Sequence, residues 1–355
     1  MSSLFILVLI IGFVGLLIPR LKTVAGYMMA IGLGIIFGEV SSEIPDYILY
    51  QNAYESSIFT ANLKFEYGYE FLTGVLQKVG FNYIEFRLFV GIAGLILITY
   101  FINKLNINSI SILFIYIINC FFIDVSQVRN FMLMVFLIMA FVTLIEGKKY
   151  NFLKSLVYIL VGASFQSLGY FFLSVYLVIL VYRMKKLRVV LSLMFIIVTA
   201  VFVLPVIRDY IIALSSSILG SGGPENDKIN TYIGDQTRLG FLLPWSIILV
   251  SIGFSIYNLN LIKQFKLSET VLVERTHSIL LVTMLSLPLL AFNIEFYRIY
   301  RDTFLLIPIS AMFIFKNITD HNNKPYVFWG LILIIIIHFV ITILPVWNSN
   351  VTYIF

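Results

Sequence analysis

The sequence predicts an all-α integral membrane protein, a single transmembrane domain over residues 1–355 that crosses the bilayer about 12 times. Two observations support this fold class. First, 60% of the residues are hydrophobic and 12% are charged, with a mean hydropathy of +0.99, whereas soluble domains have about 45–50% apolar and roughly 25% charged residues. Second, apolar runs recur along the whole chain, and a run of about 20 residues is enough to cross a bilayer.

Short connections join most predicted spans, apart from two long loops over residues 39–85 and 214–238. In the first loop, Tyr69–Val79 has the amphipathic pattern of an interfacial helix. The Gly/Ser-rich run in the second is typical of a mobile connector, with a lid over a site as the alternative. A polar break at residues 164–167 separates two short spans, as in helices that line a cavity. The spans are predicted over residues 2–18, 24–38, 86–103, 109–123, 127–145, 151–164, 167–182, 189–213, 239–257, 277–292, 302–316 and 326–346.

The basic residues predict the orientation in the membrane. With the amino terminus outside, 15 of the 24 lysines and arginines fall in inner loops, as the positive-inside rule requires, and both termini are extracytoplasmic. The inner set is mostly lysine, whereas arginine dominates the outer set. Arginine is preferred where a planar fork must hold phosphate or carboxylate, so these arginines either bind an anionic substrate or pair with outer acidic residues. They are Arg87, Arg129, Arg208, Arg238, Arg298 and Arg301.

Cysteine and histidine usage gives no sign of a metal site. Cys120 is the only cysteine and lies in an apolar run, where a small buried side chain is expected. His277, His321 and His338 are far apart and lack metal-ligand spacing. His338 lies inside the last predicted span, where a hydrogen bond to another helix is expected. The sequence therefore predicts no metal, no cofactor and, without a basic stripe, no nucleic-acid partner.

The segment Asp124–Asn130 places an acid, an amide and an arginine at the start of an apolar helix, where ionisable groups are costly and often functional. The structural alternative is a helix start with Asp124 or Ser126 as N-cap. A cation in a first helical turn opposes the helix dipole. Arg129 is therefore expected to have an anionic partner.

The segment Asn293–Asp302 contains Arg298 and Arg301 three residues apart, on one face of a helix. Together they could clamp a diphosphate; the alternative is ion pairing to Glu295 and Asp302. At the polar break, Gln166 can orient a substrate but cannot act as a base. The outer carboxylates Asp46, Glu66 and Glu70 could deprotonate a sugar hydroxyl or could be solvated loop charges.

Four segments resemble, in family order, motifs of the EpsG-like branch of the Wzy-type polysaccharide polymerases. Pro45–Tyr50 is similar to the family's Asp-Tyr-x-x-Tyr, and Phe65–Tyr69 to its Phe-Glu-x-Gly-Tyr. Gln127–Arg129 looks like its Gln-x-Arg at a helix start. Tyr297-Arg298 precedes a late span, where the family also tends to keep arginine. One position departs: where the family often has Phe-His-x-Ser, this chain has Phe165–Leu168, with glutamine in place of histidine.

The resemblance implies a glycosyltransferase of the bacterial cytoplasmic membrane. It would polymerise undecaprenyl-diphosphate-linked oligosaccharide repeat units of an O-antigen, capsule or exopolysaccharide at the outer face. Its partners would be that lipid-linked oligosaccharide, the lipid bilayer and a chain-length regulator or flippase. The implied roles are base or acceptor orientation for Asp46 and Glu66, positioning for Gln166, diphosphate binding for Arg129, Arg298, Arg301 and Arg238, and sugar contacts for Tyr50, Tyr69, Asp124, Gln127 and Tyr297.

Three other functions remain open at this stage. A flippase or transporter of the same lipid-linked sugars would need arginines in a cavity, but also charges through the bilayer, and no internal repeat of the kind common in transporters is evident. An oligosaccharide ligase, or a glycosyltransferase using a polyprenyl-monophosphate sugar, would have a similar outward site. An acyltransferase would be expected to offer a histidine there.

Overall fold

The computed structural model describes residues 2–56, 65–183, 241–265, 270–290, 293–318 and 323–346, with Leu204 and Tyr210. Within these ranges the chain forms helices and turns and no strand, so the predicted all-α fold is confirmed. The predicted loop over residues 214–238, the predicted span 189–213 (Leu204 and Tyr210 apart) and Arg238 lie outside the described residues.

The helices follow the predicted order, with two additional helices in the first long loop. The amphipathic segment predicted near Tyr69–Val79 is confirmed as the second of these. In chain order the elements are α1 (Ser2–Leu17), α2 (Lys22–Gly38), α3 (Tyr47–Ser56), α4 (Tyr67–Lys78), α5 (Tyr83–Lys104), α6 (Ser109–Tyr116), the π-helix η1 (Ile117–Phe121), α7 (Phe122–Asp124), α8 (Val128–Glu146), α9 (Asn151–Phe165), the 3-10 helix η2 (Ser167–Leu173), α10 (Ser174–Arg183), α14 (Leu242–Phe265), α15 (Thr270–Met284), α16 (Leu287–Leu290), the 3-10 helix η3 (Ile294–Tyr297), α17 (Arg298–Thr303), α18 (Leu306–Asn317), α19 (Lys324–Thr342) and the 3-10 helix η4 (Leu344–Val346).

Five helical segments are long and apolar enough to cross a membrane by themselves, and shorter apolar helices accompany them. Twelve crossings remain a prediction. The five segments are Tyr83–Lys104, Val128–Glu146, Leu242–Phe265, Val271–Leu290 and Lys324–Val346.

Three predicted boundaries were wrong by several residues. The span predicted to end at residue 257 continues to Phe265, and the other two errors have a physical cause. The span expected from residue 277 begins at Thr270, because the Arg275 guanidinium donates to the Leu144 carbonyl of α8 and so need not lie in a loop. The span expected as one helix over residues 302–316 is divided into α17 and α18. Pro308 has no N–H to donate to the Phe304 carbonyl, which instead accepts from Ile307 at 3.0 Å in a tighter turn.

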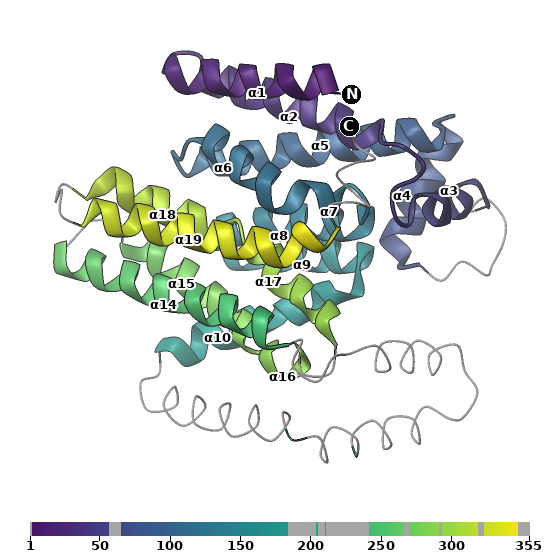
Figure 1. Cartoon of the computed structure of the whole chain (residues 1–355). Coiled ribbons are helices and arrows are strands. Elements are labelled where there is room, and N and C mark those ends of the chain that lie inside the picture. The colour runs from purple at the N-terminus through teal and green to yellow at the C-terminus, as the bar shows by residue number, and fades with distance from the viewer. Residues whose placement is uncertain are drawn as a thin grey trace.

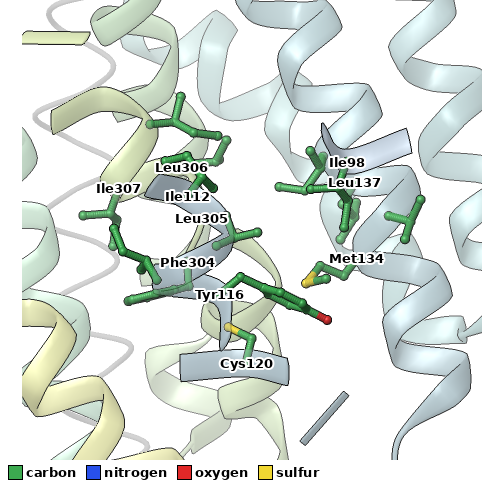
Figure 2. Packing of buried hydrophobic residues seen from close by; sticks show 14 of the residues in the cluster. Ile98, Ile112, Tyr116, Cys120, Met134, Leu137, Phe304, Leu305, Leu306 and Ile307 are labelled. Atoms are coloured by element: carbon green, nitrogen blue, oxygen red, sulfur yellow. The ribbon is translucent and has the colours of Figure 1, made fainter. Parts of the chain in front are cut away.

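The core forms around α8, whose sequence is apolar on all sides and which is therefore expected to be buried. In its most apolar window 89% of the residues are buried, against 33% in α19, and α8 lies in the middle of the bundle (Figure 1). Figure 2 shows Met134 and Leu137 of α8 in the same cluster as Tyr116, Cys120 and Phe304. This core joins the first half of the chain to the α17–α18 junction.

Two contacts show how the helices pack together. Gly34 lets α2 approach α5 so closely that a Cβ atom there would lie 2.6 Å from the Ile92 Cα atom. The hydrogen bond predicted for His338 is confirmed, because its Nδ1 atom lies 3.1 Å from Oδ1 of Asn119 in the π-helix.

The charged residues lie at opposite ends of the bundle. We call one the lysine end, which holds Lys22, Lys104, Lys316 and Lys324 at helix termini, and the other the arginine end, which holds Arg87, Arg129, Arg298 and Arg301. α3, α4 and α7 mark the arginine end, on the right in Figure 1. These described members of the predicted inner and outer sets are thus separated in space.

Candidate functional site

Arg129 lies in the first turn of α8, and its anionic partner, predicted from the helix dipole, is Glu66. The Arg129 guanidinium forms an ion pair with Oε2 of Glu66, and its Nε atom donates to the Tyr50 hydroxyl at 3.2 Å. The other oxygen of Glu66 accepts from the backbone N–H of Ser167 at 2.9 Å. One carboxylate therefore connects α8 to the start of η2 through both of its oxygens.

Two aromatic rings pack against the Arg129 guanidinium. Its Cζ atom lies 4.3 Å from the centre of the Phe65 ring and 5.6 Å from that of Tyr50, within the range of cation–π attraction. The rings of Phe65 and Tyr50 stack at 5.6 Å, and buried Tyr69 packs against both. Burial raises the pKa of the Tyr69 hydroxyl well above its ordinary value, so this group stays protonated. The Arg129 side chain is 19% exposed and the Glu66 side chain is 21% exposed, so part of the ion pair reaches solvent.

Gly68 explains how residues 65–69 reach the break between α9 and η2. A Cβ atom at this position would lie 2.1 Å from the Ser164 Oγ atom, so only glycine permits this approach. Glu66 and Gly68 of the predicted motif thus perform one task, which is to fix α4 and its carboxylate against the polar break at residues 164–167.

A groove of about 470 Å³ lies next to this break. On one side it is lined by Gln166 and η2, and on the other by Asn293, η3 and the first residue of α17. The Ser167 N–H bond to Glu66 places the Arg129 pair beside this groove. The lining residues are Gln166, Ser167, Leu168, Phe171, Asn293, Glu295, Phe296 and Arg298.

Arg298 and Glu295 form an ion pair on the wall of the groove. Their side chains are 28% and 46% exposed, so both reach solvent. Asn293 fixes the turn beneath them, because its side chain accepts from the Glu295 N–H at 2.7 Å. The ion pairing considered as an alternative is thus present for Arg298, and it leaves the guanidinium accessible from the groove.

Arg301 is buried instead of exposed beside Arg298. Its Nη2 atom donates to Oε1 of Gln127 at 2.5 Å, and its Nε atom lies 3.9 Å from Oδ1 of Asp124. Asp302 is buried as well and accepts from Asn130 at 2.8 Å. Arg301 therefore joins α17 to the turn before α8, and its ion-pair partner is Asp124, not the expected Asp302.

The helix-start alternative for Asp124 and Ser126 was wrong. Gln127 occupies the N-cap position of α8 without a side-chain capping bond. Asp124 ends α7, and the Ser126 hydroxyl donates backward to the Ile123 carbonyl at 2.8 Å. Besides Arg301, the buried carboxylate of Asp124 faces the Tyr116 hydroxyl, so its polar surroundings come from α17 and α6.

Arg87 differs from both interpretations given for the outer arginines, because its described partners are backbone carbonyls and not an acidic side chain or an open site. It is fully buried in α5, and its Nη2 atom donates to the Phe37 carbonyl at 2.9 Å and to the Val125 carbonyl at 2.8 Å. A cation suits the carboxyl end of α2, where Phe37 lies. Arg87 thus holds the turn that carries Asp124 and Gln127. The sequence feature that could have indicated this structural role is an arginine in the first two turns of an apolar helix.

The remaining predicted residues differ in their relation to the groove. Asp46 is exposed and its carbonyl accepts from the Tyr50 N–H at 3.0 Å, whereas its carboxylate is not among the partners of Arg129 or Glu66. Tyr297 is 8% exposed and packs on Tyr300 and His338, away from the lining of the groove. Among the described residues no group of three or more histidine, cysteine or acidic side chains is placed to hold a metal ion.

Comparison with known proteins agrees with the motifs that form this site. The sequence profile of the EpsG family matches residues 3–355, nearly the whole chain. The chain belongs to the EpsG family. Membership supports a membrane protein of the polysaccharide-polymerase type, with a part in polysaccharide biosynthesis. No significant match was found among curated proteins or among solved structures.

Proposed function

We propose that this EpsG-family protein is a glycosyltransferase that joins oligosaccharide repeat units carried on undecaprenyl diphosphate, and that the groove between η2 and η3 is its active site. The supporting observation is the Arg129–Glu66 pair, fixed by aromatic rings and joined through Ser167 to a groove that also exposes Arg298. With the lysine end toward the cytoplasm, as the positive-inside rule favours, the groove faces outward from the bacterial cytoplasmic membrane.

Arg298 is the group that we assign to the diphosphate. In the free protein it pairs with Glu295, and an exposed ion pair of this kind contributes at most about 1 kcal/mol. A diphosphate offers more oxygens and more charge, so it can replace Glu295 on the guanidinium at little cost. Arg129 adds a second cation with a fixed orientation. Fixed cations stabilise the charge that develops on a leaving group without reorganising during the reaction.

Glu66 is better suited to positioning than to proton transfer, because both of its oxygens are engaged, one with Arg129 and one with the Ser167 N–H. The lining of the groove includes one carboxylate, Glu295. Once Arg298 binds the diphosphate, Glu295 loses its ion-pair partner and can accept a proton. Gln166 lines the same groove and can orient the acceptor sugar.

The reaction then proceeds by displacement at an anomeric carbon. The acceptor hydroxyl oxygen attacks that carbon while its proton passes to Glu295, and the bond from the carbon to the diphosphate oxygen breaks. The electron pair leaves on undecaprenyl diphosphate beside Arg298 and Arg129. The proton is later released to water, so the carboxylate is restored. Arg301, Gln127, Asp124 and Tyr297 lie behind the groove, and we assign them to holding α17 against α8.

The test is polymerisation by the purified protein in nanodiscs, supplied with its undecaprenyl-diphosphate-linked repeat unit and no nucleotide. The variants are Arg298→Lys, Arg129→Lys and Glu295→Gln, with Lys154→Gln as the control, since Lys154 is exposed in the first turn of α9. We expect a ladder of lengthening products from native protein and control, and its loss in the three variants. A parallel reaction with a chelator tests the predicted independence from metal.

The outcomes separate the alternatives. A single transfer product without a ladder would assign the protein to the ligases. Movement of the intact lipid-linked unit across the bilayer, without a new glycosidic bond, would assign it to the flippases. A full ladder from Arg298→Lys and Arg129→Lys would remove the diphosphate role from these arginines while leaving the polymerase activity established.

A further inference from the structure

A second and larger cavity lies at the lysine end, between α1 and α6 on one side and α18 and α19 on the other. It is a groove of about 650 Å³, and most of its lining is apolar. Phe114 and Ile118 line it from α6 and η1, Met312 from α18, and Leu331 and Ile335 from α19. A groove with such walls favours a hydrocarbon ligand, because burial removes apolar surface from water or places it against well-packed side chains.

Polar side chains gather at one end of this groove. Lys22 begins α2, Lys316 lies in the last turn of α18, and Asn106 belongs to the turn between α5 and α6. Lys324 begins α19, and its Nζ atom lies 5.6 Å from the centre of the Phe315 ring, which also lines the groove. No aspartate or glutamate is among the lining residues.

The two lysines that line the groove are free to bind an anion. In the part of the chain that the structure describes, neither Lys22 nor Lys316 forms an ion pair. The one hydrogen bond of Lys316 runs to the Asn106 carbonyl at a long 3.4 Å. By contrast, Lys104 at the same end pairs with Glu146 at 2.9 Å. Within that part of the chain, two ammonium groups without an anionic partner therefore lie at helix ends beside the apolar walls.

We propose that this groove binds a membrane phospholipid with an anionic headgroup. Its acyl chains lie along α6, α18 and α19, and its phosphate lies between Lys22 and Lys316. An amphiphile with one negatively charged end satisfies both parts of the groove, whereas a neutral lipid leaves the lysines unpaired. Basic pockets between helices on the cytoplasmic side are known to take acidic lipid headgroups, and a lysine binds phosphate as a compact charge.

The lipid carrier of the proposed reaction is a poorer match. Its diphosphate is expected beside Arg298 and Arg129, at the arginine end, whereas this groove opens at the opposite end of the bundle beside Lys22 and Lys316. The groove is thus a separate site, and its occupant is independent of the polymerase proposal.

The test uses the delipidated full-length protein in detergent and native mass spectrometry with phosphatidylglycerol or phosphatidylcholine as the probe. We expect tighter binding of phosphatidylglycerol. The double variant Lys22→Gln/Lys316→Gln is expected to weaken this binding about 30-fold and to remove the preference. The matched control is Lys154→Gln/Lys263→Gln, which removes the same charge from exposed positions at helix ends outside the groove.

A second variant tests the walls without changing any charge. Ser111 lines the groove from α6, and Ser111→Trp is expected to fill it and to weaken phosphatidylglycerol binding while both lysines remain. Equal binding of the two lipids to the native protein would overturn the proposal, as would an equal loss in the control double variant. Displacement of phosphatidylglycerol by undecaprenyl phosphate at stoichiometric concentration would also overturn it, by assigning the groove to the carrier.

Discussion

The two ends of the bundle carry the same kind of charge in different ways. At the arginine end each guanidinium has defined partners, such as Glu66 and Tyr50 for Arg129 or two backbone carbonyls for Arg87. At the lysine end the ammonium groups are more exposed, and Lys104 is paired in a simple surface contact with Glu146. The difference indicates that the choice of arginine over lysine follows from the number and geometry of the partners that each side chain must bind.

The physical reason is the shape of the two side chains. A guanidinium has five donors in a fixed plane, so it can bind carboxylate, hydroxyl, carbonyl and an aromatic face at once. An ammonium is a compact charge that is best left in water or beside phosphate. Replacement of arginine at one end should therefore cost far more than replacement of lysine at the other, and the following predictions test that contrast.

The largest effect is expected for Arg87→Ala. It removes the donors from the Phe37 and Val125 carbonyls, and each buried acceptor left unpaired costs about 1–3 kcal/mol. The apparent melting temperature in detergent should fall strongly, and Arg87→Lys should recover little of the loss because one ammonium does not reproduce the fork. A melting temperature equal to that of the native protein would show that Arg87 does not hold the turn before α8.

A smaller effect, confined to activity, is expected for Arg129→Lys. Lysine keeps the charge but loses the simultaneous contacts with Glu66, Tyr50 and the Phe65 ring, so transfer should slow by about 100-fold or more. The melting temperature should change little, since this pair is partly exposed. The check is single-turnover transfer with native protein and variant at saturating substrate, and similar rates would place Arg129 outside the reaction.

Gly68→Ala is expected to displace Glu66 without altering the Glu66 side chain itself. The added methyl group meets the Ser164 side chain, and overpacking of this kind costs about 1–3 kcal/mol. Stability and activity should fall together, because α4 must move away from the break between α9 and η2. The double variant Gly68→Ala/Ser164→Gly removes the contacts with the Ser164 side chain but leaves the carbonyl oxygen of residue 164 at 2.8 Å from the added methyl group, so it should restore stability and activity in part. No recovery at all would show that the contact with the Ser164 side chain is not what displaces α4.

The smallest effect is expected at the lysine end, for Lys104→Gln. Its ion pair with Glu146 is partly exposed, with a lysine side chain 34% accessible, and such pairs contribute about 0.2–1 kcal/mol. The change in melting temperature should be small and should vanish at high salt, while activity stays at the native level. A loss as large as that of Arg87→Ala would remove the contrast between the two ends.

Part of the site could be predicted from the sequence because its cause is local. A cation in the first turn of α8 requires an anion, and the structure supplies Glu66. The polar break at residues 164–167 marks the end of α9 in the structure, and Gln166 and Ser167 line the groove. The amphipathic pattern near Tyr69–Val79 predicted the helix that carries Glu66 and Gly68 toward that break.

Other parts depend on contacts between distant segments. Arg298 and Arg301 share a helix and a spacing, yet one lines the groove and the other is buried against Gln127 and Asp124. The role of Arg87 depends on carbonyls 50 and 38 residues away. Nothing in the sequence next to Arg298 and Arg301 indicates that the first lines the groove and the second is buried.

The sequence by itself determined the solvent, the fold class and the placement of charged residues between the apolar runs. These follow from composition and from the cost of placing charge in hydrocarbon, which act on each segment independently. Only the tertiary structure decided which carboxylate meets which guanidinium. It also decided that the groove lies between η2 and η3, and that a second groove opens between Lys22 and Lys316. Those features arise where helices distant in sequence pack together, and packing partners are set by the three-dimensional fit of whole surfaces.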